Sequence, residues 1–301
     1  MVVAQVDRSP VSRWGTLVSG VSAAAGAVPP TAHVLVGIVS VQVGAAVAKQ
    51  LFSVAGATGA VTLRLALAAV VFLLLWRPSI RLNRHALPVI LGYGVVLGTM
   101  NLCFYFAIER IPLGIAVTAE FLGPLTVALV GSRRWLDGLW ALLAAAGVVL
   151  LSQTGGAVSI VGLAFALAAG ACWGLYILLG SALGKRTSDG SGLALASVVA
   201  AALVVPFGVV DSGTAMLQPI VLVAGLGVAL MSSVIPYSLE LHALRRVPPR
   251  VFGVLMSLEP AVAALAGLVV LHEALRPAQW VAICCVVAAS AGATRFSQPQ
   301  P

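Results

Sequence analysis

The sequence predicts an all-α integral membrane protein whose ten transmembrane helices form two inverted repeats of five. Three observations lead to this fold class. The 301 residues are 60% hydrophobic and 9% charged, with a mean hydropathy of +1.08, so the chain has too few polar side chains to cover a soluble globule. The apolar residues fall into runs long enough to cross a bilayer. One phrase in the first half recurs 136 residues later.

The predicted helices follow from dividing the apolar sequence into spans of roughly 20 residues, since the hydrocarbon core is about 30 Å thick and a helix rises about 1.5 Å per residue. The first repeat covers residues 33–152 and the second 158–294, with tails at 1–32 and 295–301. The fifth span is barely long enough to cross. The expected helix cores are His33–Phe52, Ala57–Leu75, Leu87–Phe106, Leu113–Val130, Gly138–Ser152, Val158–Gly180, Leu193–Val210, Pro219–Leu239, Val251–Val270 and Pro277–Thr294.

Lysine and arginine residues predict the orientation, because cytoplasmic loops carry an excess of them. With the N-terminus inside, 13 basic residues fall on the cytoplasmic side and 3 outside, so both termini are expected in the cytoplasm. Residues 1–32 resemble a signal peptide, but their apolar stretch is interrupted and a disordered tail is the preferred interpretation. The inner set is Arg8, Arg13, Arg77, Arg81, Arg84, Arg133, Arg134, Lys185, Arg186, Arg245, Arg246, Arg250 and Arg295; the outer set is Lys49, Arg110 and Arg276.

The recurring phrase defines the symmetry of the fold. Ala107–Pro112 followed by Glu120–Pro124 is similar to Ala243–Pro248 followed by Ser257–Pro260. Five helices separate equivalent positions, and this odd number places one copy outside and the other inside. Inverted repeats in secondary transporters hold a binding site near the midplane and expose it alternately to the two sides. A duplicated channel or scaffold is the alternative.

Two cations lie in the predicted spans. Arg64 is about seven residues into the second helix, roughly 10 Å below the outer surface, where its guanidinium could bind a substrate carboxylate through two parallel hydrogen bonds. An internal ion pair with Glu120 or Glu259 is the alternative. Lys49 shares a helical face with Gln42 and lies closer to the surface, so it could bind substrate or extend its ammonium group to the interface.

Two carboxylates lie beside prolines expected to kink their helices. Pro124 removes the helical partner of the Glu120 backbone carbonyl, so the carboxylate and this carbonyl could together receive a substrate ammonium group or a proton. Glu259, next to Pro260, approaches the midplane from the cytoplasmic side. Proton-driven export needs a titrating group, and Glu120 and Glu259 are the candidates for proton coupling. A paired or permanently protonated carboxyl is the alternative for each.

Polar and aromatic residues extend the candidate site. Asn101 in the third helix and Tyr237 in the eighth lie on faces with other small or polar residues, so we expect both to line the substrate cavity. Trp173 and Tyr176 fit either a cavity wall or an ordinary helix interior.

Several function classes are excluded by what the sequence lacks. It contains no Walker loop and no metal-ligand pair such as His-x-x-x-His, and its four cysteines lie in apolar runs without metal-ligand spacing. We therefore expect no enzyme, cofactor, metal or direct ATP drive. The net charge of +8 comes from short basic clusters between apolar runs, which indicates membrane loops and no nucleic-acid partner.

Five segments of the chain resemble those of a known family, namely Ala48–Phe52, Leu63–Leu65, Asn101–Pro124, Ser233–Glu240 and Phe252–Ala261. They are similar to segments of the EamA-type group of the drug/metabolite transporter superfamily, and the resemblance covers nearly all of residues 33–294. Within this group the chain is most similar to exporters of threonine and homoserine. One departure is that the fourth and ninth helices of the group often end in Gly-Glu, where this chain has Leu136-Asp137 and His272-Glu273.

The resemblance and the residues together predict a secondary exporter of a small amino acid, threonine or homoserine, in the bacterial inner membrane. Its partners would be the amino acid, protons exchanged by antiport, and the lipid bilayer. An EamA-type exporter of another metabolite or a drug is one alternative, and a channel is another.

Overall fold

Every regular element in the described part of the chain is helical. The computed structural model describes residues 29–78, 86–130, 135–153, 159–184, 186–187, 190–244 and 249–296. In chain order the elements are α2 (Pro30–Gln50), α3 (Phe52–Trp76), α4 (Leu87–Arg110), α5 (Leu113–Glu120), α6 (Leu122–Val130), α7 (Trp135–Gln153), α8 (Ile160–Gly184), α9 (Ser191–Ser212), the 3-10 helix η1 (Gly213–Leu217), α10 (Pro219–Ala229), the π-helical turn η2 (Leu230–Val234), α11 (Ile235–Leu244), α12 (Pro249–Met256), α13 (Glu259–Val270) and α14 (Pro277–Phe296).

Eight helical segments among the described residues are long and apolar enough to cross a membrane. Two further apolar segments, Leu113–Leu129 and Gly138–Leu151, are shorter. The second of these belongs to α7, which at 19 residues is longer than the fifth predicted span. The described part of each predicted helix core is mostly helical, with turns at Leu51, Phe121, Ser257 and Leu258, and Val158 lies outside the described residues.

Pro124 and Pro260 each lie beside a break in a long helical segment. Pro124 has no N–H and its ring crowds the carbonyl four residues earlier, and α5 ends at that residue, Glu120. In the second half the break falls between α12 and α13, and α13 carries Pro260 in its first turn, where a missing N–H is tolerated.

Glycine allows the reversal between α2 and α3 and the close crossing of other helices. Gly56 has a φ of 64°, a left-handed conformation, and regular helix follows from Ala57, where the predicted core begins. A Cβ on Gly123 would collide with the backbone of Gly170, so α6 and α8 cross nearly in backbone contact.

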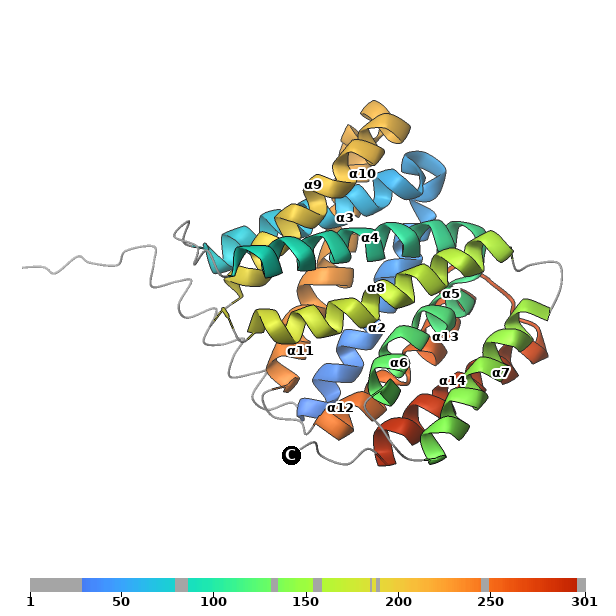
Figure 1. Cartoon of the computed structure of the whole chain (residues 1–301). Helices are drawn as coiled ribbons and strands as arrows, with labels where there is room; N and C mark the ends of the chain where they lie inside the picture. Colours follow the sequence, from blue (N-terminus) through green and yellow to red (C-terminus); the bar gives the residue numbers. More distant parts are fainter. Residues whose placement is uncertain are drawn as a thin grey trace, which may run out of the picture.

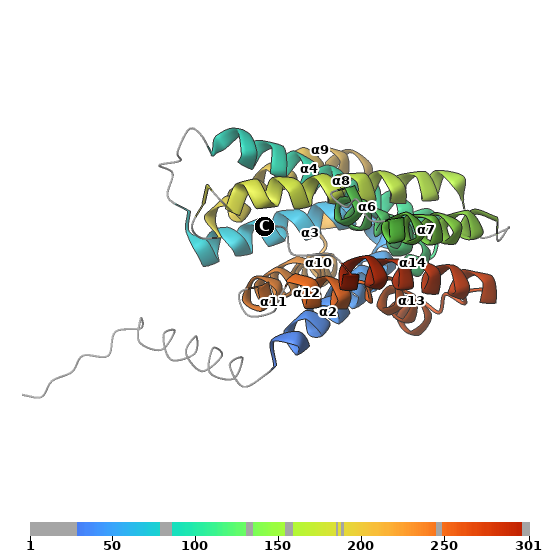
Figure 2. The ribbon, with the colours of Figure 1, turned by 60° about the horizontal axis from the view of Figure 1, so that its bottom comes forward.

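The helices form two groups that face each other across the middle of the molecule. Figure 2 shows α3, α4, α8 and α9 on one side and α2, α11, α12, α13 and α14 on the other. Within the first group α3 packs against α9, and α4 packs against both α8 and α9; within the second, α2 packs against α11 and α13. The helix α5 lies between α8 and α13, and α6 packs against α8 and α14 (Figure 1).

Several predictions fall outside the described residues. The predicted N-terminal tail is nearly all within residues 1–28, and the C-terminal tail is largely within 297–301, since α14 continues to Phe296. Most of the basic residues used to orient the chain are also outside, namely Arg8, Arg13, Arg81, Arg84, Arg133, Arg134, Lys185, Arg245 and Arg246.

Candidate functional site

A cavity of about 520 Å³ lies between the two helix groups. Its volume is within the range of roughly 300–1,000 Å³ found for small-molecule sites. Segments from both halves of the chain contribute to its wall. The lining residues are Val41, Gln42, Ala45, Arg64, Met100, Asn101, Phe104, Val117, Glu120, Phe121, Pro124, Leu125, Ala128, Trp173, Tyr176, Ile177, Ser232, Pro236, Tyr237, Phe252, Gly253, Met256, Glu259, Ser290 and Thr294.

Arg64 reaches this cavity from α3 with only 6% of its surface exposed. Its Nε donates to Oγ of Ser233 at 3.2 Å, and its Nη2 donates to the carbonyl oxygen of Ser232 at 2.9 Å. The ring centre of Tyr105 lies 5.8 Å from Cζ, a cation–π contact. These bonds use one edge of the planar guanidinium. The other edge, which carries Nη1, is not used by these two bonds and can bind a carboxylate end-on.

Glu120 provides an acid in the same cavity. It ends α5, is 8% exposed, and is near enough to Arg64 for their charges to attract. Gly170 of α8 packs directly on its backbone carbonyl, and a Cβ there would lie 2.5 Å from that oxygen. The backbone of Glu120 is thus fixed by helix packing, while its side chain borders the cavity.

Glu259 is the second acid of the lining and comes from the other half of the chain. It is the first residue of α13 and is 5% exposed. The N-terminus of a helix carries a partial positive charge, so the dipole of α13 favours an acidic side chain at this position. Since the cavity holds one cation and two acids, protonation of one acid would change its net charge.

The other predicted lining residues also border the cavity. Asn101 of α4 donates from Nδ2 to the Leu97 carbonyl oxygen of its own helix at 2.8 Å. Tyr237 of α11 borders the cavity, and its ring centroid lies 6.1 Å from that of Phe72. Pro124 is in the lining as well, whereas Pro260 is not.

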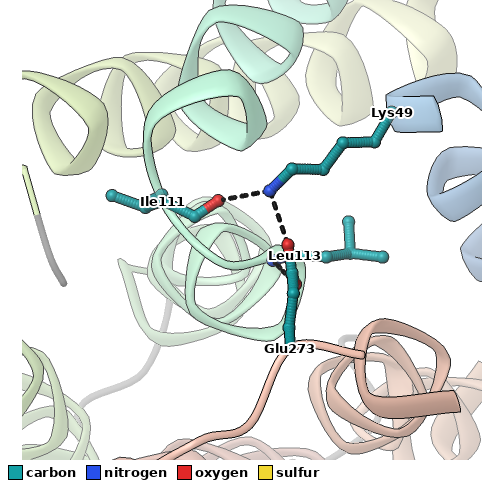
Figure 3. Close-up of polar contacts among 4 residues, drawn as sticks. All are labelled: Lys49, Ile111, Leu113 and Glu273. Carbon is teal, nitrogen blue, oxygen red and sulfur yellow. Dashed lines mark hydrogen bonds and ion pairs between the residues drawn. The ribbon is translucent and has the colours of Figure 1, made fainter. Parts of the chain in front are cut away.

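Lys49, predicted for substrate binding, lies apart from the cavity lining, and in this conformation its ammonium group is held by protein atoms. Its Nζ is 2.6 Å from Oε1 of Glu273 and donates to the Ile111 carbonyl oxygen at 3.1 Å. The second oxygen of Glu273 accepts from the N–H of Leu113 at 2.8 Å. Figure 3 shows this network, which joins the end of α2 to the start of α5 and to the segment after α13. We call it the Lys49–Glu273 latch.

The cavity extends away from the latch. Its lining reaches Ala128, Phe252 and Thr294, which lie near the end of α6, the start of α12 and the end of α14. These helix ends are at the opposite end of the bundle from the latch (Figure 1). The structure therefore combines a cavity extending towards one end of the bundle with a polar network at the other.

Several lining residues were missed or left open by the sequence. Trp173 and Tyr176 both line the cavity. The rings of Trp173 and Phe121 pack edge to face, with their centroids 5.6 Å apart. Gln42 could have been predicted as a lining residue from the sequence, because a glutamine in an apolar helix needs polar partners. Ser290 and Thr294 gave none, since isolated hydroxyl residues are common in membrane helices and can bond to their own backbone.

No cluster of metal-ligating side chains is found among the residues that the structure describes. The four cysteines are all unpaired. The cavity lining supplies charged groups, hydrogen-bonding groups and aromatic surface.

Comparison with known proteins identifies the family of this chain. The profile of the EamA-like transporter family matches residues 160–295. The threonine/homoserine exporter RhtA of Escherichia coli (strain K12) is 44% identical over 269 residues, covering 88% of this chain and 91% of that protein. The chain belongs to the EamA-like transporter family. RhtA of Salmonella typhimurium (strain SL1344) is 43% identical over 276 residues, covering 90% and 93%.

This membership confirms the predicted family. Family membership and the apolar helices together show that this EamA-type chain is a multi-pass membrane protein. Both relatives are exporters by name. The crystal structure of another protein matches with a TM-score of 0.55 over 87% of this chain and 96% of that chain. At 18% identity this match supports the fold alone.

Proposed function

We propose that this EamA-type transporter exports a small amino acid, threonine or homoserine, by alternating access with proton antiport. The observation that carries the proposal is that Arg64 and Glu120, buried and of opposite charge, border one cavity. A free amino acid at neutral pH carries a carboxylate and an ammonium group, and this pair can bind both. The two relatives above are named as threonine/homoserine exporters, which supports the same substrates.

In this proposal the free edge of Arg64 binds the carboxylate and Glu120 binds the ammonium group. Asn101 and Tyr237 contact the remainder of the substrate, whose hydroxyl group needs a polar partner in a largely apolar cavity. Lys49 stays a further candidate for substrate contact, although in this conformation its ammonium group bonds to Glu273 and to the Ile111 carbonyl oxygen.

The test of substrate identity is uptake of labelled threonine into inside-out membrane vesicles, with homoserine and a panel of other metabolites and drugs as competitors. Saturable uptake inhibited by homoserine supports the proposal. The aromatic lining around Trp173 and Phe121 gives the alternative, export of a larger apolar metabolite or drug, a physical basis. Strong inhibition by such compounds and none by homoserine would favour that alternative.

The helix contacts support two inverted repeats with ten membrane spans. A shift of 136 residues relates α2 to α8, α3 to α9, α4 to α10–α11, α5–α6 to α12–α13, and α7 to α14. Contacts between helices are repeated when each helix is replaced by its equivalent in the other half. The helices α5 and α6 pack against α8, and their equivalent α13 packs against α2, the equivalent of α8. In the same way α4 packs against α9, and its equivalent α10 packs against α3. The pairs α3–α9 and α7–α14 join equivalent helices directly.

We propose an inner-membrane orientation in which both termini are cytoplasmic, as the basic residues indicate. In a background without the four native cysteines, single cysteines at Arg77 and Arg276 lie at opposite ends of the bundle, and both positions are exposed. An impermeant thiol reagent added to intact cells is expected to label the cysteine at 276 and not that at 77. Rapid labelling at 77 would contradict this orientation.

In this orientation the latch closes the outer end and the cavity extends towards the cytoplasm, as expected for a carrier ready to load substrate for export. The latch must separate before the outer end can open. It joins α2 and α5 of the first half to the segment after α13 of the second, so relative motion of the halves would break it.

Removing the latch cation is expected to favour outer opening. The Lys49 and Glu273 side chains are 20% and 16% exposed, and an ion pair of this kind stabilises the conformation that contains it by on the order of 1 kcal/mol. Lys49→Met should therefore shift the equilibrium between the closed and the open outer end about fivefold towards the open conformation. The measurement is the labelling rate of a single cysteine at Val117, a buried lining residue, by an impermeant reagent outside.

The control is Arg110→Met, which breaks the exposed Arg110–Glu109 pair at the same end. It is expected to leave the labelling rate unchanged. Equal labelling rates in Lys49→Met and the parent would show that the latch does not hold the outer end closed.

A further inference from the structure

The helical segment that the sequence predicts as continuous over Pro219–Leu239 contains a π-helical turn, η2. The N–H of Ile235 bonds to the carbonyl of Leu230, five residues earlier rather than four. Pro236 follows immediately and has no N–H, so the Ser232 carbonyl, four residues earlier, loses its usual helical donor. The backbone of this segment therefore needs donors from outside its own helix.

Two other helices supply those donors. Ser40 of α2 donates its hydroxyl to the Met231 carbonyl oxygen at 2.8 Å. Arg64 of α3 donates from Nη2 to the Ser232 carbonyl oxygen at 2.9 Å and from Nε to Oγ of Ser233 at 3.2 Å. Ser232 and Ser233 are 1% and 2% exposed, so these bonds are shielded from water.

Close packing fixes the turn itself. A Cβ on Gly44 of α2 would collide with Oγ of Ser232 and lie 3.0 Å from Cβ of Met231, so only glycine allows α2 to approach this closely. The turn is therefore held from α2 on one side and from Arg64 on the other. It presents a carbonyl and a hydroxyl to one edge of the guanidinium, and the Tyr105 ring lies over its face.

We propose that η2, through the Ser232 carbonyl and the Ser233 hydroxyl, is the positioning element that orients Arg64 so that its free edge binds the substrate carboxylate. This inference rests on the proposed role of Arg64 as carboxylate anchor. Ser233 and Pro236 act through Arg64: the hydroxyl of Ser233 accepts from Nε, and Pro236 keeps the Ser232 carbonyl free of a helical donor.

The test compares threonine with threonine methyl ester as competitors of labelled threonine uptake into proteoliposomes. The ester keeps the ammonium and hydroxyl groups but lacks the carboxylate charge, so the ratio of its inhibition constant to that of threonine reports the use of Arg64. Ser233→Ala and Pro236→Ala are expected to lower this ratio about three- to tenfold, the effect of a misplaced hydrogen-bonding group.

Two variants serve as controls. Ser233→Thr keeps a hydroxyl on Cβ and should retain the ratio of the unmodified protein. Ser238→Ala removes a hydroxyl that bonds to Val234 of the same helical segment and lies outside the cavity lining, so it should also leave the ratio unchanged. A general loss of packing would weaken both competitors equally and leave the ratio constant.

The outcomes distinguish the role of Arg64 as carboxylate anchor from the positioning role of η2. If threonine and its methyl ester inhibit the unmodified protein equally, Arg64 is not the carboxylate anchor, and the positioning role of η2 is then wrong as well. If it distinguishes them strongly but Ser233→Ala and Pro236→Ala retain the full ratio, the anchor stands and the positioning role of η2 is wrong.

Discussion

Replacing Arg64 by lysine is expected to raise the apparent KM for threonine roughly ten- to 150-fold, because a charge-assisted hydrogen bond contributes about 1.5–3 kcal/mol. Lysine keeps the positive charge but loses the planar group that binds a carboxylate through two parallel bonds. It also cannot reproduce the paired bonds of Nε and Nη2 to Ser233 and Ser232. The measurement is initial uptake into inside-out vesicles, corrected for the amount of inserted protein.

Arg110→Lys is the matched control for this substitution. Arg110 lies at the surface, where it pairs with Glu109 and stacks on Phe106 and Phe165. Its replacement is expected to leave the KM for threonine unchanged. An unchanged KM in Arg64→Ala would show that Arg64 does not anchor the substrate.

Replacing Glu259 by glutamine is expected to abolish accumulation driven by a pH difference, because glutamine imitates the protonated carboxyl permanently. In inside-out vesicles with an acidic interior, the ratio of internal to external threonine should fall to about 1. Exchange of threonine at equal pH should continue, since that process needs no change in protonation. The two activities are measured in the same vesicle preparation.

Glu120→Gln should behave differently, because its carboxylate is assigned to the substrate ammonium group. Loss of that charge is expected to abolish both accumulation and exchange. Glu109→Gln, at an exposed position, should affect neither. If Glu259→Gln vesicles still accumulate threonine in response to a pH difference, Glu259 is not the coupling residue.

The charged members of the site could be predicted because a charge inside an apolar span has few explanations. Arg64, Glu120 and Glu259 stand out in the sequence for this reason, and all three border the cavity. Lys49 satisfied the same rule, but its partner Glu273 is 224 residues away, and no local pattern indicates that pair. The sequence could therefore identify a costly charge without identifying what compensates it.

Helix positions were predictable for a similar reason. Length and hydropathy locate the spans, and Pro124 and Pro260 mark where two of them break. The π-helical turn was not predicted, although Pro236 in an apolar span was a signal for irregular backbone. Which face of a helix meets another depends on tertiary packing, so Trp173 could not be assigned to the cavity from its sequence context.

In the proposed mechanism a carrier binds one amino acid in this cavity and exposes it to one side of the membrane at a time. The decisive measurement is counterflow, in which proteoliposomes loaded with unlabelled threonine are diluted into a trace of labelled threonine at equal pH. We expect transient accumulation of label above equilibrium, saturable by external threonine and lost in Arg64→Ala. Flux that rises linearly with concentration and shows no stimulation by internal threonine would contradict it and indicate a channel.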